Sequence, residues 1–579
     1  MHQAASIPTS LTFNPENHVL RSFIPQTRNS LEFELTVRHP IAYPTLYPVE
    51  FQSLPLDTLL NPTRISRSQL QSSSTWYSRL GLPSTSQPAP LHIDSASTEL
   101  VVGPAPCRPL VDDRLRNLSI AFWTDVHMSN DLAARIISLY LEVDYPVLPI
   151  FNAELFLDDL LRQRHYFCSR LLVCALMSWA CQAFTSISPE TRELSVAFFS
   201  EADTILADQA QLNTLTTVSA LQFLCMTAIT QGRDDIASRY LRRGIAIGKA
   251  MGLFGLHPGK ASADAWVDGY RDWRIAASYT SWGLESPPSL PTPVQVEHQS
   301  APHVGFVNTH TFHIESFQAC CELWTIFNGV LWTRYGEDGG GSLYRRSLAY
   351  AEEVYSRLLD WAGRLPLELI RCLESNHAVM MMHVYFHAIV TDVFRPFVHG
   401  TEQDTSLSSF ATPQASAEGA YAASINQLKR LLLLYKLNFR TATLSVHWQT
   451  SIVYVANAIV REAGATSVEW RYYLYLCIAG LEDLYGSFRA FGLIVKALLG
   501  MALEHNAITP EEVKRVRREL KELGQPYEDT NPLGEDRGVE VASWIINLDL
   551  ALTDPEAAQG SNLAARFDSM VLQDGEESN

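Results

Sequence analysis

The stretch Tyr140–Leu160, with the sequence YLEVDYPVLPIFNAELFLDDL, constrains the fold of this chain more than any other segment. Pro146 and Pro149 lack an amide hydrogen and restrict their own φ angles. The helix that contains Tyr140 must therefore end near Asp144. Apolar residues recur at helical spacing in the second half of the stretch. We predict two helices joined by a short, buried crossing.

Helical periodicity continues from there through most of the chain, and no strand pattern of comparable strength accompanies it. The predicted helices are Asp131–Val143, Phe167–Ser186, Arg192–Ala207, Thr214–Gln231, Asp234–Met251, Trp266–Gly283, Phe317–Tyr335, Leu343–Arg364, Glu374–Phe397, Ser424–Asn438, Val446–Ala463, Trp470–Phe491 and Leu493–His505. Thr509-Pro510-Glu511-Glu512 forms a capping box that opens a further helix to Leu523. We expect an all-α fold, a large multi-helix bundle, since 47% of the 579 residues are hydrophobic and can fill a large core.

Composition divides the chain into five parts. Residues 1–115 are rich in Pro, Ser and Thr and predict an irregular N-terminal region in which Leu31–Val37 could form a strand. Residues 116–400 form the main helical region, and residues 401–424 predict a flexible linker. Residues 425–525 complete the same helical body, and residues 526–579 form an acidic tail.

The charge balance argues against broad electrostatic binding of nucleic acid. The chain has 44 Lys and Arg against 62 Asp and Glu, a net charge of −18. Residues 1–120 contain nine arginines and no lysine, balanced by nine acids, so they form no basic arm. Phosphate contacts need clustered cations. Sequence-specific DNA binding by this chain alone is therefore unsupported.

Cysteine usage predicts a reducing compartment and no metal cluster. The nine cysteines are an odd number, and no C-x-x-C pair occurs. Cys168, Cys174 and Cys181 lie in an apolar helical pattern and are expected in the core. No signal peptide is evident, and the most apolar segment, Leu171–Phe184, is too short to span a membrane. We expect a soluble intracellular protein.

Three blocks of this sequence resemble, in order, the fungal-specific transcription factor domain, the helical region found downstream of zinc-cluster DNA-binding modules. They are YLEVDYPVLPIF from Tyr140, YLRRGIAIGKAMGLFG from Tyr240 and MHVYFHAIVTDVFRPF from Met382. In the second block, Gly244, Ala246, Gly248 and Ala250 are expected to allow close helix packing. The resemblance implies a nuclear regulator of transcription that modulates activity through its helical body.

The zinc cluster that precedes this domain in the family needs six cysteines in two C-x₂-C-x₆-C runs, which this sequence lacks. The resemblance therefore implies either action through a partner transcription factor or coactivator, or a fragment of a longer factor. A small-molecule effector is also implied, because some members of the family sense small molecules. The alternative is a helical ligand-binding or interaction scaffold with no role in transcription.

A metal-dependent enzyme is the third hypothesis. His383 and His387 stand four residues apart on a predicted helix, with His377 before them and Asp392 after them. No Glu follows His383, so the metalloprotease pattern is absent, and packing is the better interpretation. Gly339–Gly341 follows no strand and predicts a turn, not a phosphate loop. We expect no catalytic residues, no cofactor and no metal.

Two aromatic or apolar patterns remain open. Phe317, Trp324, Phe327 and Trp332 recur at helical spacing and are expected to serve the core, with a ligand pocket as the alternative. Near the C-terminus, Phe567, Met570, Val571 and Leu572 alternate with Asp568 and Asp574. This composition is typical of acidic activation segments, but equally of a solvated tail. Trp544, Ile545 and Leu548 could instead dock on the helical body.

Overall fold

The computed structural model describes residues 30–46, 110–208, 213–251, 316, 318–327, 347–372, 375–398, 405–412, 415–439, 444–463, 469–529 and 544–576. These residues form helices joined by short connections. They contain no β-sheet, only two isolated bridges, Ser406 with Ser416 and Ile545 with Gln559. The predicted all-α fold is confirmed. None of the described helices is long and apolar enough to cross a membrane.

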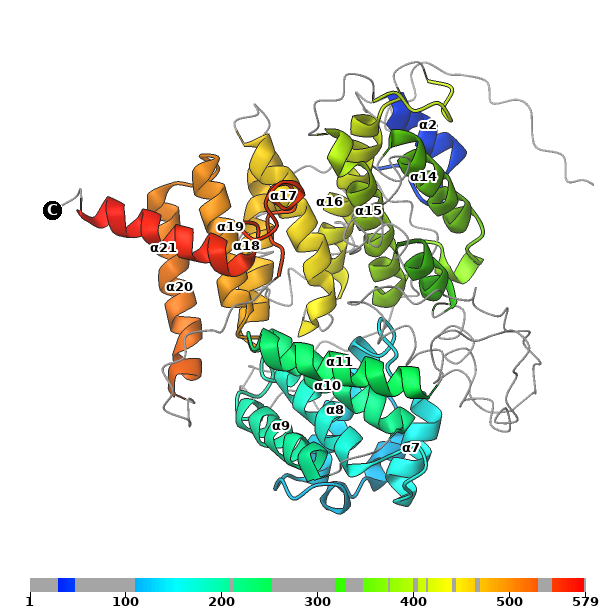
Figure 1. The fold of residues 1–579 in the computed structure, drawn as a ribbon, viewed down its shortest axis with the longest axis vertical. Coiled ribbons are helices and arrows are strands. Elements are labelled where there is room, and N and C mark those ends of the chain that lie inside the picture. The colour runs from blue at the N-terminus through cyan, green and yellow to red at the C-terminus, as the bar shows by residue number, and fades with distance from the viewer. Residues whose placement is uncertain are drawn as a thin grey trace, which may run out of the picture.

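The first group of helices occupies the lower part of the molecule in Figure 1. It comprises α6 (Asn130–Val143), α7 (Ala153–Arg162), α8 (Arg170–Phe184), α9 (Thr191–Asp208), α10 (Leu215–Thr230) and α11 (Asp234–Ala250). Helix α8 packs against α6, α9 and α10, and α10 packs against α11. Because α8 is covered on all these sides, its side chains from Leu171 to Phe184 are buried, which explains why its sequence is apolar around the whole helix.

The second group forms a row of helices above the first. It comprises α14 (Leu348–Gly363), α15 (His377–Val398), α16 (Ala417–Asn438), α17 (Gln449–Glu462), α18 (Glu469–Tyr485), α19 (Phe491–Glu504) and α20 (Pro510–Asp529). Each helix from α14 to α19 packs against the next one along the chain. Neighbours in sequence are therefore also neighbours in space in this group.

The two groups meet through hydrogen bonds and shared packing. The Ala490 amide donates to the Thr230 carbonyl over 2.9 Å, and the hydroxyls of Ser186 and Ser487 lie 2.6 Å apart. The ring centroids of Trp179 and Phe488 lie 5.7 Å apart. One apolar core runs through both groups. The boundaries of the five predicted parts remain a prediction.

Residues 30–38 form a helix, so the predicted strand at Leu31–Val37 is wrong. Helix α2 (Ser30–Arg38) packs on α16 and buries Leu31 and Leu35, which lie one helical turn apart. Glu34 accepts hydrogen bonds of 2.9 Å from the amides of Ala411 and Thr412. Burial opposes ionisation of Glu34, but hydrogen bonds from the Thr412 hydroxyl, these two amides and Arg38 outweigh it and lower its pKa to about 2. Contacts with segments that are distant in sequence therefore determine that residues 30–38 form a helix.

Several predicted helix ends also needed correction. Helix α16 begins at Ala417 instead of Ser424, so the segment 401–424 is not a linker over its full length. Its N-cap Ser416 accepts a hydrogen bond from the Gly419 amide, which sequence inspection did not identify as a cap. The predicted end of the helix Glu374–Phe397 holds within one residue, since α15 continues through Pro396 to Val398. The predicted helix Trp470–Phe491 is interrupted between α18 and α19.

Other predictions were confirmed or lie outside the described residues. Helix α6 ends at Val143 with Asp144 as its C-cap, as the two prolines predict. The Thr509–Glu512 capping box forms, with both reciprocal hydrogen bonds in place. The predicted helix Trp266–Gly283 and the predicted turn Gly339–Gly341 lie outside the described residues.

Gly480 allows α18 to approach its neighbours closely. A Cβ atom added there would lie 2.8 Å from Trp448 and 2.9 Å from Ile452. We expect Gly480→Ala to lower the free energy of unfolding by about 1–2 kcal/mol, since overpacking outweighs the better helix propensity of alanine. Urea unfolding measures this change. Gly363→Ala is the matched control, because nothing lies within 4 Å of its added Cβ atom, and an equal loss in both variants would contradict the packing argument.

Candidate functional site

Asp144, the C-cap of α6 near the start of the Tyr140–Leu160 stretch, joins three segments that are distant in sequence. Its side chain is 3% exposed. One carboxylate oxygen accepts a 2.8 Å hydrogen bond from the Trp179 indole on α8, and the other accepts a 2.5 Å bond from the Ser445 hydroxyl. The His447 ring lies 3.9 Å away, and burial lowers its pKa although Asp144 opposes the shift. The imidazole is therefore neutral at neutral pH, and Asp144 is held mainly by hydrogen bonds.

A small cavity of about 10 Å³ lies beside Asp144. It is lined by Leu139, Tyr140, Val143, Asp144, Ala180, Ala183 and Leu444. The buried Tyr140 hydroxyl has no hydrogen-bond partner. This volume is close to the space that a single water molecule needs, and far below that of a pocket for an organic ligand. The cavity is therefore too small for an organic effector.

We expect Asp144→Ala to lower the free energy of unfolding by about 3 kcal/mol, because the Trp179 and Ser445 donors lose a charged acceptor. Urea unfolding followed by tryptophan fluorescence measures the loss. Asp131→Ala is the control on the same helix, since Asp131 is 70% exposed and its ion pair with Arg135 lies on the surface. A change below about 1 kcal/mol in Asp144→Ala would contradict a central role for this network.

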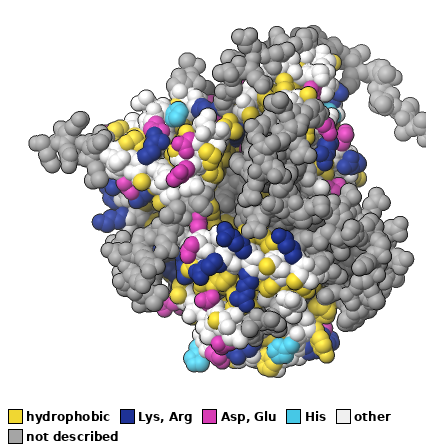
Figure 2. All heavy atoms as spheres, in the orientation of Figure 1, with side chains coloured by type: hydrophobic (Ala, Val, Ile, Leu, Met, Phe, Trp, Pro, Cys, Tyr) yellow, Lys and Arg dark blue, Asp and Glu magenta, His cyan; other side chains and the backbone are white. Residues whose placement is uncertain are grey.

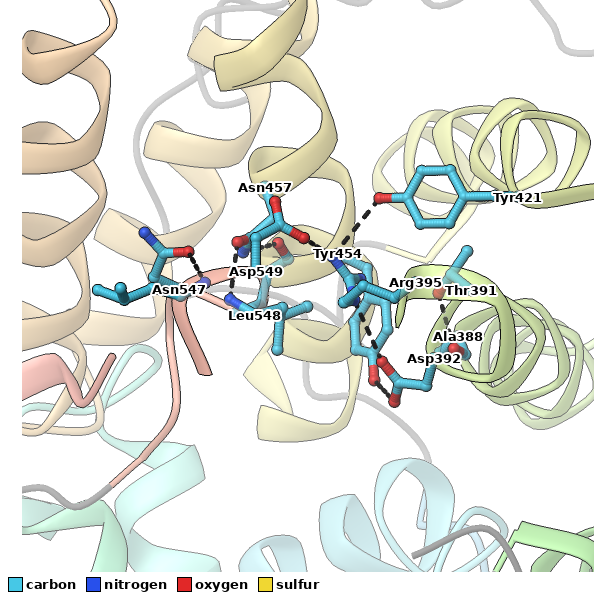
Figure 3. Close-up of polar contacts among 12 residues, drawn as sticks. Ala388, Thr391, Asp392, Arg395, Tyr421, Tyr454, Asn457, Asn547, Leu548 and Asp549 are labelled. Atoms are coloured by element: carbon cyan, nitrogen blue, oxygen red, sulfur yellow. Dashed lines mark hydrogen bonds and ion pairs between the residues drawn. The ribbon is translucent and has the colours of Figure 1, made fainter. Parts of the chain in front are cut away.

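Arg395, from the third block, is the centre of a second buried network (Figure 3). The residue is 1% exposed. Its guanidinium group lies 2.6 Å from Asp549 and 3.6 Å from Asp392, and it faces the rings of Tyr421 and Tyr454. Burial opposes its charge, but Tyr421, Asp392 and Asp549 outweigh this effect and keep the pKa of Arg395 above its usual value.

Arg461 completes a balanced set of two cations and two carboxylates. Its side chain lies 3.1 Å from Asp549 and donates a 2.8 Å hydrogen bond to the Tyr421 hydroxyl. Arg395 belongs to α15 and Arg461 to α17, whereas Asp549 precedes the short helix η9 (Leu550–Leu552) near the C-terminus. The network therefore fastens the C-terminal segment to the helical body.

The C-terminal segment makes further contacts with the body. The Asn457 side chain donates to the Ile546 carbonyl over 2.8 Å and accepts from the Leu548 amide over 2.9 Å (Figure 3). The rings of Trp544 and Phe491 lie 5.6 Å apart. The predicted docking of this segment is confirmed.

The acidic tail ends in a helix that sequence inspection did not predict. Helix α21 (Gly560–Glu576) packs on α19, and Phe567 is fully buried there. Asp568 pairs with Lys496 at 3.0 Å, and Arg566 pairs with Glu504 at 2.6 Å. The side chains of Val571 and Leu572 lie outside the described residues. An acidic-apolar segment whose central aromatic residue is buried is a docked helix in this structure, not a solvated tail.

The candidate metal ligands are engaged by different partners and do not form a group of three or more in the described structure. His383 is bonded to the Leu369 carbonyl at 3.1 Å, and His387 lies 3.4 Å from the Ser424 hydroxyl. Asp392 accepts a hydrogen bond from Tyr454, and His377 bonds to the Glu142 carbonyl. Burial and Arg371 lower the pKa of His383 to about 3, so it is neutral. Within the described residues, no group of three or more His, Cys, Asp or Glu side chains could hold a metal ion.

The remaining sequence candidates serve the core where they are described. Cys168, Cys174 and Cys181 are fully buried, and burial is the main cause that raises the pKa of each thiol. Trp324 is partly buried against Phe327 and Tyr385, with ring separations of 5.6 and 5.3 Å. The other two residues of this aromatic stripe, Phe317 and Trp332, lie outside the described residues.

Helix α11, from the second block, presents a cationic surface. Figure 2 shows Lys and Arg side chains gathered over this helix, and Arg239, Arg242, Arg243 and Lys249 are exposed. Gly244 and Gly248 face inward, and Gly244 lies close to Leu221 of α10. Ala246 and Ala250 are exposed instead, so the predicted packing role is wrong for these two. Residues spaced by two cannot share one helix face.

Three known proteins are similar to part of this chain, and all three are named as transcription factors or activators. The chain is 24% identical over 362 residues to the nitrogen assimilation transcription factor nit-4 of Neurospora crassa, covering 55% of this chain and 32% of the relative. It is 24% identical to the notoamide biosynthesis transcriptional activator notL' of Aspergillus versicolor, covering 55% of each. The resemblance to fungal transcription factors is confirmed. A third such factor, the nitrogen assimilation transcription factor nirA of Emericella nidulans, is 23% identical over 55% of this chain and 39% of its own length.

The similarity to fungal transcription factors lies in the middle region of the chain. The chain spans between about a third and just over half of the length of these relatives. No family model and no solved structure match it. Sequence inspection quoted Asp144 only as a helix end and Arg395 only as part of a motif. A charged residue inside an otherwise apolar block is the signal that could have identified both as buried network residues.

Proposed function

We propose that this chain is a fungal transcription regulator that controls a set of genes through its helical body. The observation that carries the proposal is the likeness of 55% of the chain to three proteins named as transcription factors or activators. None of these relatives is named as an enzyme, and the described residues contain no group of three or more His, Cys, Asp or Glu side chains that could hold a metal ion. Both observations support a regulatory role over a catalytic one.

The proposal includes nuclear location and action through other transcription factors or coactivators. A net charge of −18 disfavours broad contact with DNA phosphates. Helix α11 is a local exception to this negative charge, because its exposed cations form a positive surface (Figure 2). An acidic segment of a partner would bind to this surface. Three of these four side chains are arginines, which bind carboxylates in bidentate geometry.

A reporter assay in a fungal host tests this function. The chain is fused to an unrelated DNA-binding domain, and transcription of a reporter is compared with that domain alone. We expect a change of several-fold with the wild-type chain. The variant Arg239→Glu/Arg242→Glu/Arg243→Glu should lose most of it at equal protein level, because all three side chains are exposed. The control Arg135→Glu, on the first helix group, should keep it.

Location and gene deletion separate the proposal from its alternative. A fluorescent fusion without the foreign domain should be nuclear, and deletion should change a defined set of transcripts. A cytoplasmic protein whose deletion leaves every transcript unchanged would instead favour the interaction scaffold. Tight, sequence-specific DNA binding by the purified chain would overturn action through a partner.

A further inference from the structure

Residues 30–46 dock on the second helix group as a segment of their own. Residues 47–109, outside the described part, separate them in sequence from the next described residue, Leu110. Helix α2 packs on α16 and lies at the outer end of the second helix group in Figure 1. A helix of nine residues has little stability in water by itself. Contacts with residues distant in sequence therefore hold this segment in place, as they would hold a bound peptide.

Two leucines and one carboxylate anchor α2. Leu31 and Leu35 lie one helical turn apart, and both are fully buried. Glu34 accepts hydrogen bonds of 2.9 Å from the amides of Ala411 and Thr412, and one of 2.5 Å from the Thr412 hydroxyl. Hydrogen bonds to an ionised acceptor are stronger than those between neutral groups. The docking face therefore combines two apolar sites with a site for a carboxylate.

The same face offers further polar groups to this segment. The Asn426 amide nitrogen on α16 donates to the Glu32 carboxylate over 3.3 Å. Tyr43 is fully buried, its hydroxyl lies 2.8 Å from the Ser424 hydroxyl, and it accepts a 2.9 Å hydrogen bond from Tyr355 on α14. An apolar helix would leave these buried donors unpaired at a cost in free energy. The face therefore matches the pattern Leu-Glu-x-Glu-Leu, followed by a tyrosine eight residues later.

We propose that this face of α14, α15 and α16 is a binding site for an amphipathic helix of a partner protein with the pattern Leu-Glu-x-Glu-Leu. Residues 30–46 occupy the site in cis and are the template for the partner helix, because its leucines and carboxylates would meet the same apolar sites and donors. The partner's identity as a transcription factor or coactivator rests on the proposed function, whereas the binding site does not.

Competition within the chain sets how such a site responds. A tethered segment has an effective concentration of about a millimolar, so it excludes a helix of equal intrinsic affinity that is present at lower concentration. A partner must therefore bind more tightly than residues 30–46, or bind when their docking is weakened. Its binding releases residues 30–46 from the second helix group.

A labelled peptide tests the site in the full chain. Leu31→Asp/Leu35→Asp should empty the face, because both leucines are fully buried there. A fluorescent peptide with the wild-type sequence of residues 30–46 is titrated into this variant and into the wild-type chain, with anisotropy as the measurement. We expect at least tenfold tighter binding to the variant, since the tethered segment competes in the wild type. A peptide with the same two substitutions is the control and should bind neither chain.

Hydrogen exchange locates the bound peptide. The amides of Ala411 and Thr412 should exchange faster in the variant than in the wild type and regain protection when the peptide is added. If the leucine variant does not fold, Glu34→Lys takes its place with the same expected ratio, because it removes the carboxylate and keeps both leucines. The proposal is overturned by no binding to the folded variant, by equal binding to variant and wild type, by binding of the control peptide, or by binding that leaves these two amides unprotected. The peptide assay involves no transcription, so its outcome is separate from that of the reporter assay.

Discussion

Replacing Arg395 by alanine is expected to lower the free energy of unfolding by about 3–5 kcal/mol, because it removes a fully buried cation that pairs with two partly buried carboxylates, Asp392 and Asp549. Asp549 would keep its ion pair with Arg461, at 3.1 Å, and Asp392 would keep its hydrogen bond with Tyr454. The rings of Tyr421 and Tyr454 would also lose the guanidinium group packed against them. Urea unfolding of the purified chain measures the loss.

Limited proteolysis reports which part of the chain responds. Because Asp549 belongs to the C-terminal segment, Arg395→Ala should speed cleavage within residues 544–576 before cleavage in α6 to α11. Arg135→Ala is the matched control, since it breaks an exposed ion pair with Asp131 and should cost no more than about 1 kcal/mol. A loss of equal size in both variants would show that the buried network adds nothing to stability.

Periodicity was sufficient for the helices that bury a wide apolar stripe. Helices α6, α9, α10 and α11 each begin and end within one residue of the predicted bounds. Periodicity did not predict the correct structure where a short segment depends on contacts with residues distant in sequence. Leu31–Val37 alternates like a strand, yet α2 forms because α16 covers Leu31 and Leu35 and the 411–412 loop bonds to Glu34. Such contacts leave no local signature.

Long-range polar contacts explain what the sequence could not show of the site. Arg395 and Asp549 are separated by 154 positions, and Asp144 and Ser445 by 301. Local spacing can place a helix end at Asp144, but it cannot show which side chains of other helices converge there. Spacing likewise placed His383 and His387 on one helix, whereas the structure gives each a different partner.

The second large effect concerns α21. We expect Phe567→Ala to weaken docking of α21 on α19 by about 3–5 kcal/mol, because Phe567 is fully buried between them. Hydrogen exchange should rise in residues 560–570 and stay unchanged in α6 to α8. Ser569→Ala is the control on the exposed side of the same helix. Unchanged protection in Phe567→Ala would contradict an anchoring role for this ring.

Gly500→Val releases the same helix from the opposite side without altering the tail. A Cβ atom at Gly500 would lie 3.2 Å from the Phe567 Cβ and 3.6 Å from the Leu563 carbonyl, so a larger side chain on α19 expels α21. If the acidic-apolar face of α21 activates transcription once exposed, Gly500→Val should raise reporter output several-fold. Phe567→Ala, which removes the central aromatic residue of that face, should not. Equal reporter output from the two variants would show that α21 only stabilises the fold. A rise in reporter output confined to Gly500→Val would show that the released helix acts on the transcription machinery.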